Sequence, residues 1–319
     1  MTAASLLRPL KWLVALTLSS FAWTALAQEA YPSRPIEFIV PWGPGGGSDQ
    51  TARMLVSLLE SELKVSLPVI NVPGGTGNTG MAKLLAAPAD GYSIAILAWD
   101  SLALLATQPP KWTAEDIVPL SIVIQLPSAL YVSGNRYADF KAFEAAAKSR
   151  PLNVAISGFG SPDDITINFL VSKGLKLIAV PFAKPGERYS ALLGNHVDAL
   201  YSPAGNIGSF VDSKQMRPIL VLDAERLRDF GAVPTSRESG YDIALTQRRA
   251  VIARAGTDPA RIRLLSDALA RVTATAKYKA YLRESFALDT SVVPTKETLE
   301  IMKRDVADMK KIVQLTPKK

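Results

Sequence analysis

Two glycine-rich stretches hold the residues of this chain that are best suited to bind an anion. They are residues 43–49 (GPGGGSD) and residues 74–80 (GGTGNTG). Each follows an apolar run and precedes a segment with helical spacing, so each places backbone NH groups at the start of a helix. Such groups have no partner within the helix, and the helix dipole favours a negative charge beside them. Glycine also lets a ligand approach the backbone closely, because it has no Cβ.

The two stretches lie in consecutive strand–helix units. Successive parallel strands bring their carboxyl ends to the same edge of a sheet, so we expect both helix starts to face one carboxylate. Each charge-assisted bond from an amide would contribute about 1.5–3 kcal/mol. Two alternatives stay open: tight connections that bind nothing, and a dinucleotide site, because residues 75–80 fit the G-x-G-x-x-G pattern. The short helix that follows makes the dinucleotide site the weaker of the two.

The composition excludes several kinds of catalytic and metal site. The chain has 319 residues, no cysteine and a single histidine, His196. Thiol chemistry, disulfides and multi-histidine metal sites are therefore excluded, and a histidine triad would depend on His196 alone. His196 follows Gly194 and Asn195, which predicts a surface turn. We expect no catalytic residue, no metal and no cofactor.

The first 27 residues have the pattern of an export signal. Arg8 and Lys11 precede or flank an apolar run at residues 12–22, and the ALA that ends at Ala27 matches a cleavage site. Cleavage there would remove these two cations, so the net charge would change from +7 to +7 − 2 = +5. No later run approaches the roughly 20 apolar residues of a membrane span, and the basic residues are scattered. We expect a soluble exported protein that does not bind nucleic acid.

Strand-like runs alternate with helical patterns along the rest of the chain, which predicts α/β layers with mainly parallel strands. The length is typical of about two domains. The expected strands are residues 36–41, 67–72, 92–98, 129–132, 153–157, 175–181, 199–202, 217–222 and 250–253. The expected helices are residues 49–63, 81–87, 137–148 and 165–173, a helix capped by Asp258, and a last helix with Leu299, Met302, Val306, Met309 and Val313 on one face.

Several longer stretches carry a family pattern when they are taken in order. They are YPSRPIEFIVPWGPGGGSDQTARMLVSLL, VPGGTGNTGMAKLLAAPADGYSIAI, EDIVPL, VPFAKPGERYSALLGNHVDALYS, VPTSRESGY and ARAGTDPARIRLLSDAL. Together they resemble the substrate-binding receptors of tripartite tricarboxylate transporters, also called Bug proteins. The similarity covers nearly all of the chain that follows the export signal.

The resemblance implies a periplasmic-binding-protein-like (type II) α/β fold, with two domains, a hinge and a ligand cleft between the domains. It places the first domain at residues 30–127 plus 250–319 and the second at residues 128–249. It implies a monomer in the periplasm that captures a small carboxylate and delivers it to the subunits of a membrane transporter.

The resemblance also implies which residues bind the ligand. The family's first carboxylate-binding loop matches Gly45, Gly46, Gly47, Ser48 and Asp49, preceded by Trp42 where an aromatic residue packs on the ligand. The second loop matches Gly75, Thr76, Gly77, Asn78 and Thr79. The remaining cleft positions are Ser101, Ser157, Gly160, Ser161 and Ser202.

Three departures from the family pattern bear on the ligand. Asp164 replaces a frequent histidine, and Ser202 replaces an aspartate, which argues against an amino-acid ligand whose ammonium group needs a counter-charge. Arg248 and Arg249 stand where family members commonly have Trp-x-Gly, and bidentate pairing could favour a ligand with a second carboxylate. The alternative for these arginines is an exposed surface pair.

Other polar and aromatic residues have structural interpretations. Asp163 and Asp164 follow Ser161-Pro162, so we expect them to cap a helix rather than hold a metal. Tyr131, Tyr201 and Phe182 are expected in the core.

Two alternative functions stay open at this point. One is an exported α/β enzyme that acts on a carboxylate ester or phosphate, and the other is a receptor that feeds a sensor kinase.

Overall fold

The computed structural model describes residues 30–108 and 110–316. The expected export signal at residues 1–27 therefore lies outside the described residues. Residues 34–319 form one compact unit, and all that follows concerns this unit. None of the helices in the described part of the chain is both long and apolar enough to cross a membrane.

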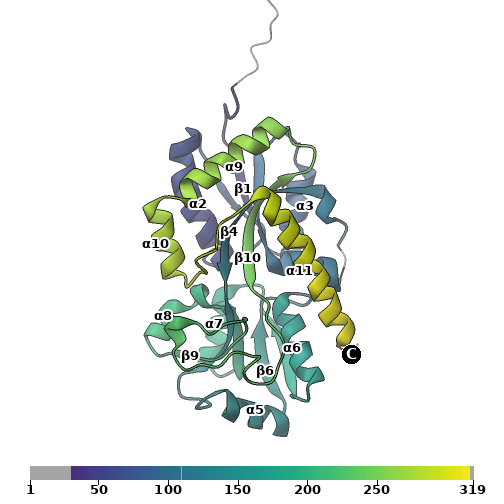
Figure 1. Ribbon diagram of the computed structural model, residues 1–319, viewed down its shortest axis with the longest axis vertical. Helices are drawn as coiled ribbons and strands as arrows, with labels where there is room; N and C mark the ends of the chain where they lie inside the picture. The colour runs from purple at the N-terminus through teal and green to yellow at the C-terminus, as the bar shows by residue number, and fades with distance from the viewer. Residues whose placement is uncertain (1–29, 109, 317–319) are drawn as a thin grey trace, which may run out of the picture. The chain divides into compact units, whose positions relative to one another are not determined.

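The unit contains two β-sheets, which lie one above the other in the view of Figure 1. The six-stranded sheet has the order β11-β4-β10-β3-β1-β2, and the five-stranded sheet has the order β7-β6-β8-β5-β9. The first sheet consists of β1 (Glu37–Val40), β2 (Val69–Asn71), β3 (Ser93–Ala98), β4 (Ile117–Leu126), β10 (Gln247–Arg254) and β11 (Val293–Pro294). The second sheet consists of β5 (Ser128–Ser133), β6 (Leu152–Ile156), β7 (Leu177–Pro181), β8 (Ala199–Pro203) and β9 (Met216–Val221).

The prediction of mainly parallel strands is wrong, because both sheets are mixed. Four strand pairs of the described residues are parallel and five are antiparallel. A parallel pair needs a long crossover, usually a helix. Strand β4 instead runs into β5 with only Pro127 between them, and β10 enters the six-stranded sheet from the loop after residue 240, with no helix before it.

Helices cover the faces of both sheets. The α-helices are α2 (Gly47–Leu63), α3 (Asn78–Ala86), α4 (Trp99–Thr107), α5 (Phe140–Ser149), α6 (Pro162–Ser172), α7 (Pro185–Leu193), α8 (Gly208–Asp212), α9 (Pro259–Thr273), α10 (Ala276–Glu284) and α11 (Thr295–Leu315). Short 3₁₀ turns are η1 (Gly75–Gly77), η2 (Ala114–Asp116), η3 (Ala204–Asn206) and η4 (Arg228–Phe230). The sequence did not predict β4, β11, α4, α7, α8 or α10.

Most of the helix caps and core residues that the sequence predicts are found in the structure. Asp258 caps α9 by accepting a bond from the amide of Ala260, as predicted. Helix α6 is capped by Ser161, so Asp163 and Asp164 occupy its first turn and are not its N-cap. Tyr131 and Tyr201 are fully buried. Phe182 is partly buried against the hydrophobic cluster that contains Tyr131, while His196 is exposed in a turn.

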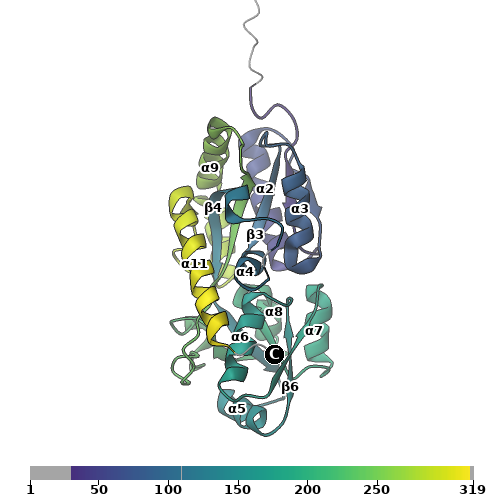
Figure 2. The same ribbon diagram turned by 90° about the vertical axis from the view of Figure 1, so that its right-hand side faces the viewer.

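Helix α11 contacts elements of both sheets (Figures 1 and 2). Its Met302 is buried in the cluster of the six-stranded sheet. Two turns later, Met309 packs with Ile165 of α6, beside the five-stranded sheet. Between them, Asp305 accepts a bond from Trp99 Nε1 at 2.8 Å and pairs with the guanidinium of Arg248.

We expect Asp305→Ala to lower the free energy of unfolding by about 3 kcal/mol, because the mostly buried guanidinium of Arg248 would lose its carboxylate. Urea unfolding measures this change. Asp308→Ala is the matched control on the same helix, since Asp308 pairs only at the surface with Lys311 and its loss should cost less than about 0.5 kcal/mol. Equal losses in the two variants would contradict a structural role for the Asp305 pair.

Candidate functional site

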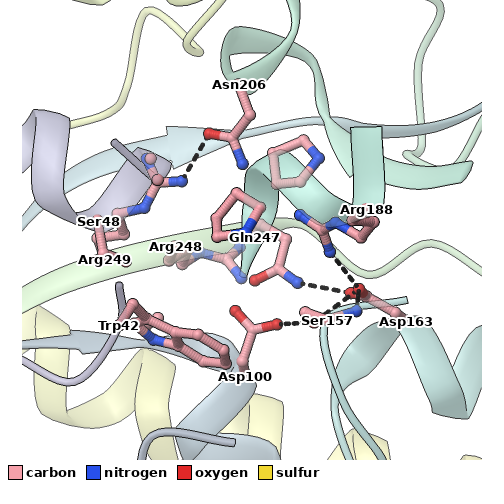
Figure 3. Close-up of a pocket in the computed structure, with 15 residues that line it drawn as sticks. Trp42, Ser48, Asp100, Ser157, Asp163, Arg188, Asn206, Gln247, Arg248 and Arg249 are labelled. Carbon is pink, nitrogen blue, oxygen red and sulfur yellow. Dashed lines mark hydrogen bonds and ion pairs between the residues drawn. The ribbon is translucent and has the colours of Figure 1, made fainter. Parts of the chain in front are cut away.

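A cavity of about 50 Å³ lies between loops of the two sheets, and we call it the arginine cavity (Figure 3). Residues of the six-stranded sheet and its loops form one side, and the loops and helices of the five-stranded sheet form the other. The lining residues are Trp42, Gly46, Gly47, Ser48, Ala98, Asp100, Ser157, Asp163, Pro185, Arg188, Pro203, Asn206, Gln247, Arg248 and Arg249.

The first glycine loop presents the start of α2 to this cavity. Its first intrahelical bond runs from the amide of Gln50 to the carbonyl of Gly46. The amides of Gly47 and Ser48 come before this bond, so the helix gives them no partner. Both residues are buried and line the cavity.

Asp49 fixes the shape of the first loop. Its buried carboxylate accepts bonds from the Gly45 amide at 2.9 Å, from Arg53 Nε at 2.9 Å and from Asn71 Nδ2 at 3.0 Å. Burial alone would raise the pKa of Asp49, but these hydrogen bonds outweigh it and lower the pKa below its ordinary value. Asp49 therefore holds the loop rather than lining the cavity.

The three arginines of the cavity have different partners. Arg248 pairs with Asp305 and donates to Gln125 Oε1 at 2.6 Å. Arg188 lies 3.5 Å from the carboxylate of Asp163. The prediction of an exposed arginine pair is wrong, since Arg249 is only 7% exposed and Arg248 is partly buried.

Arg249 is the buried cation that lacks a carboxylate. Its guanidinium donates to Thr51 Oγ1 at 3.2 Å and to Asn206 Oδ1 at 3.0 Å. Across residues 30–108 and 110–316 it takes part in no ion pair. Burial lowers the pKa of Arg249, against the attraction of Tyr281 and Asp100.

Two donors of the cavity also lack acceptors. Trp42 Nε1 and Arg188 Nε are buried and have no hydrogen-bond partner in the described part of the chain. An unpaired buried donor is costly. Together with Arg249 and the start of α2, they make the cavity suitable for an anion.

Two carboxyl groups meet at Ser157 in the same cavity. Ser157 Oγ lies 2.6 Å from Asp100 Oδ1 and 2.7 Å from Asp163 Oδ2. A hydroxyl group has one hydrogen, so only one of these contacts can use it. The other contact requires a proton on a carboxyl group. Burial, reinforced by the charge of Asp100 and opposed by Arg188, raises the pKa of Asp163 to about 7.

This raised pKa predicts a pH-dependent stability. The folded protein holds the proton of Asp163 more tightly than the unfolded chain does, because the pKa of this carboxyl group is raised in the fold. The resulting stabilisation is fully present below the ordinary pKa of 3.8, and it is lost as the pH rises through about 7. The groups that face Asp163 are Asp100 from α4, Arg188 from α7, Ser157 from β6–α6 and Gln247 from β10.

In the wild type, the melting temperature should fall between pH 4 and pH 8, by roughly 2–4 °C for each kcal/mol of stability that is lost. In Asp163→Asn this fall should be smaller, because the titrating carboxyl group is absent. Asp308→Asn, which removes a surface carboxylate, should leave the wild-type slope unchanged. Melting curves of the three proteins at matched ionic strength provide the measurement. Parallel slopes in the wild type and Asp163→Asn would contradict the raised pKa.

The second glycine loop lines a different cavity of about 670 Å³, which shares Trp42 and Ser157 with the first. We call it the second-loop cavity; its lining residues are Trp42, Gly74, Gly75, Thr76, Asn78, Leu104, Gln108, Pro110, Ser157, Gly158, Phe159, Pro181 and Ala183. The amides of Gly77 and Thr79 bond to the carbonyl of Gly74, and that of Asn78 bonds to Gly75. The two loops therefore line two cavities that share Trp42 and Ser157.

Several predicted site residues form internal contacts of the loops. Ser101 is fully buried and donates to the carbonyl of Thr76 at 3.0 Å. Ser161 caps α6, and the carbonyl of Gly160 accepts a bond from Thr107 Oγ1 at 3.0 Å. Ser202 is fully buried and donates to the carbonyl of Pro203 at 3.2 Å.

The remaining members of the predicted set lie around the two loops. Gly45 is exposed at the edge of the first loop, Gly77 is buried against Ser101, and Thr79 lies behind Gly74. None of these three lines either cavity.

Five polar residues that line the arginine cavity are absent from the ligand contacts predicted from the sequence. They are Asp100, Asp163, Arg188, Asn206 and Gln247. Asp100 could have been found, because it follows a predicted strand at the sheet edge that carries the glycine loops.

Hydrogen bonds connect residues on the side of the six-stranded sheet with residues on the side of the five-stranded sheet. Thr76 Oγ1 donates to the carbonyl of Phe159 at 3.1 Å, and Gln247 Nε2 donates to Asp163 Oδ1 at 3.3 Å. A Cβ on Gly46 would lie 2.9 Å from Pro185 Cγ, so the first loop and α7 are almost in contact.

Comparisons with known proteins agree in family and fold. Residues 51–316 match the family described as tripartite tricarboxylate transporter family receptor. The protein BugT of Bordetella pertussis is 32% identical over 251 residues, which cover 76% of this chain and 77% of BugT. A TctC solute-binding protein from Polaromonas is 28% identical, with a TM-score of 0.66 over 89% of this chain and 99% of that structure. MatC from Rhodopseudomonas palustris with bound malate is 22% identical, with a TM-score of 0.80 over 89% of this chain and all (100%) of that one.

Proposed function

Because the chain belongs to the family of tripartite tricarboxylate transporter receptors, we propose that it binds a small carboxylate in the arginine cavity and delivers it to membrane transporter subunits. Membership of this family confirms the prediction of a solute-binding receptor and does not favour the alternative of an exported enzyme. The related MatC structure contains malate, which supports a carboxylate as the ligand.

The observation that carries the proposal is the unpaired guanidinium of Arg249 beside the start of α2. Burying a cation without an anion is costly. A ligand carboxylate would neutralise Arg249 and accept bonds from the amides of Gly47 and Ser48. Trp42 and Arg188, whose Nε1 and Nε atoms have no hydrogen-bond partner in the described residues, also line this cavity.

Of the residues predicted from the sequence, we propose that Trp42, Gly46, Gly47, Ser48 and Ser157 contact the ligand, because all five line the arginine cavity. To these we add Asp100, Arg188, Asn206 and Arg249. The other predicted residues would act indirectly: Asp49 shapes the first loop, and the second loop forms the neighbouring cavity.

We propose that the cleft closes around the ligand by relative movement of two domains, residues 30–127 plus 250–319 and residues 128–249. The carboxylate would first dock on α2 and Arg249. Closure would then add Arg188, Ser157 and Asn206 from the other side. The ligand stabilises the closed state only by its greater affinity for that state.

We propose that the receptor works as a monomer in the periplasm. The family description names a transporter receptor, which supports a membrane transporter rather than a sensor kinase as the recipient.

A thermal-shift screen tests the carboxylate. Small carboxylates and their neutral amides form matched pairs, and only the carboxylates should raise the melting temperature. A ligand at 100 times its Kd stabilises the folded state by about 2.7 kcal/mol. The proposal is contradicted if no carboxylate shifts the transition, or if the amides shift it equally.

A further inference from the structure

Two acidic side chains from opposite sides of the arginine cavity meet at one serine (Figure 3). Ser157 Oγ lies 2.6 Å from Asp100 Oδ1 and 2.7 Å from Asp163 Oδ2. Asp100 is in the first turn of α4, which follows β3 of the six-stranded sheet. Ser157 follows β6 of the five-stranded sheet, and Asp163 is in the first turn of α6. The contact between Asp100 and Ser157 therefore joins the two domains that move in the proposed closure.

The hydrogen atoms of this cluster do not suffice for both contacts when both acids are ionised. The hydroxyl group of Ser157 has one hydrogen, which can serve only one of the two carboxyl oxygens. One additional proton satisfies both contacts: the protonated carboxyl group donates to Ser157 Oγ, and Ser157 Oγ donates to the other carboxylate. The pair then keeps a single negative charge, and Arg188 lies 3.5 Å from Asp163 to balance it.

Burial makes this proton more necessary. Asp163 is only 1% exposed, so water does little to screen its charge from that of Asp100. Burial, reinforced by the charge of Asp100 and opposed by Arg188, raises the pKa of Asp163 to about 7. The proton belongs to the coupled pair rather than to either acid alone. When the cleft opens, Asp100 leaves the pair, and its contribution to the raised pKa is lost.

The other groups around the pair do not ordinarily change charge in the same pH range. The titratable and charged groups that face the pair are Arg188 of α7, Tyr201 of β8, and Arg248 and Arg249 of β10. Arginine and tyrosine side chains ordinarily keep one charge state between pH 5 and pH 8. The pair is therefore the group of the cavity that titrates in this range.

We propose that closure of the cleft takes up one proton from solvent, which Asp100 and Asp163 share through Ser157, so that a falling pH favours the closed receptor. This inference rests on the domain closure of the proposed function. A bound carboxylate would add a negative charge beside the pair, which favours the same proton further. Ligand capture and proton uptake would then reinforce each other, because such a coupling is reciprocal.

Fluorescence energy transfer between two labels tests the proposal without any ligand. The chain has no cysteine, so Pro44→Cys and Lys184→Cys place one label in the first loop and one at the start of α7. Both positions are exposed. The two segments almost touch in this structure, since a Cβ on Gly46 would lie 2.9 Å from Pro185 Cγ. With dyes that are insensitive to pH, the transfer efficiency reports the ratio of closed to open protein.

The closed-to-open ratio of the wild type should be at least about tenfold higher at pH 5 than at pH 8, because uptake of one proton changes an equilibrium by up to about tenfold per pH unit. Asp100→Asn should remove this response and hold the ratio at the higher value. The asparagine amide donates to Ser157 Oγ without a proton from solvent. His196→Gln is the matched control: it removes the single histidine of the chain, a residue type that titrates in this range, and should keep the wild-type response.

Asp163→Asn is the second variant, in case Asp100→Asn does not fold, and it should remove the response in the same way. Equal ratios at both pH values in the wild type overturn the proton coupling. A wild-type response in folded Asp100→Asn or Asp163→Asn protein overturns it as well. These outcomes involve no ligand, so they leave the carboxylate receptor to the thermal-shift screen. Failure of that screen alone would remove the carboxylate and leave the proton coupling standing.

Discussion

Gly47→Ala is expected to weaken ligand binding by at least about 100-fold, which corresponds to about 2.7 kcal/mol, while the protein stays folded. An added Cβ would overlap Asn206 Oδ1 and Arg249 Nη2 and would lie 2.8 Å from Asn206 Cγ. Both side chains can move, but moving them would disrupt the hydrogen bond between Arg249 and Asn206 beside the start of α2. Alanine at the first position of α2 does not oppose the helix.

The matched control is Gly43→Ala in the same loop. A Cβ on Gly43 would have no atom within 4 Å, so its affinity should stay at the wild-type value. The melting temperature without ligand and titration with the best carboxylate from the screen separate folding from binding. Wild-type affinity in Gly47→Ala would show that the α2 start and Arg249 do not form the binding site.

Arg249→Met is expected to change binding and stability in opposite directions. Removing the cation that faces the ligand carboxylate should cost about 2–5 kcal/mol, or about 30-fold to several thousand-fold in Kd. Without ligand, the same change removes a buried charge that has no carboxylate partner. The free energy of unfolding should therefore rise, because a buried charge that serves binding destabilises the ligand-free fold.

Arg254→Met is the control on the same strand. Arg254 donates to the carbonyl of Ala87, away from the cavity, so its loss should leave the affinity unchanged. Urea unfolding and titration give the two quantities. A fall in both stability and affinity for Arg249→Met would make Arg249 a structural residue, and the unpaired charge would no longer identify an anion site.

The parts of the fold that local spacing determines could be predicted from the sequence. The helix after the first glycine loop, the Asp258 cap and the buried tyrosines each depend on residues within a turn or two of one another. Strand β4 was not predicted from the sequence, because Pro119, Ser121 and Gln125 interrupt its apolar run. Helix α4 was not predicted either, because it follows β3 directly, without a turn residue between them.

The composition of the site could be predicted only in part. Ser157 and Asp100 meet across 57 residues of sequence, and no local pattern contains that pairing. The adjacency of Arg248 and Arg249 in the sequence predicts a shared role, which the structure does not show. Successive side chains of a strand point to opposite faces, so in β10 Arg248 reaches Asp305 while Arg249 reaches Asn206.

The long C-terminal helix has a mechanical consequence. Met302 is buried in the cluster of the six-stranded sheet, and Met309 packs against Ile165 of α6, which lies beside the five-stranded sheet. A rotation of one sheet against the other would therefore have to slide or bend α11 between these two methionines. Asp305 occupies that interval and holds Arg248, whose guanidinium borders the cavity. If the two domains move as proposed, that movement would therefore be coupled to the position of α11.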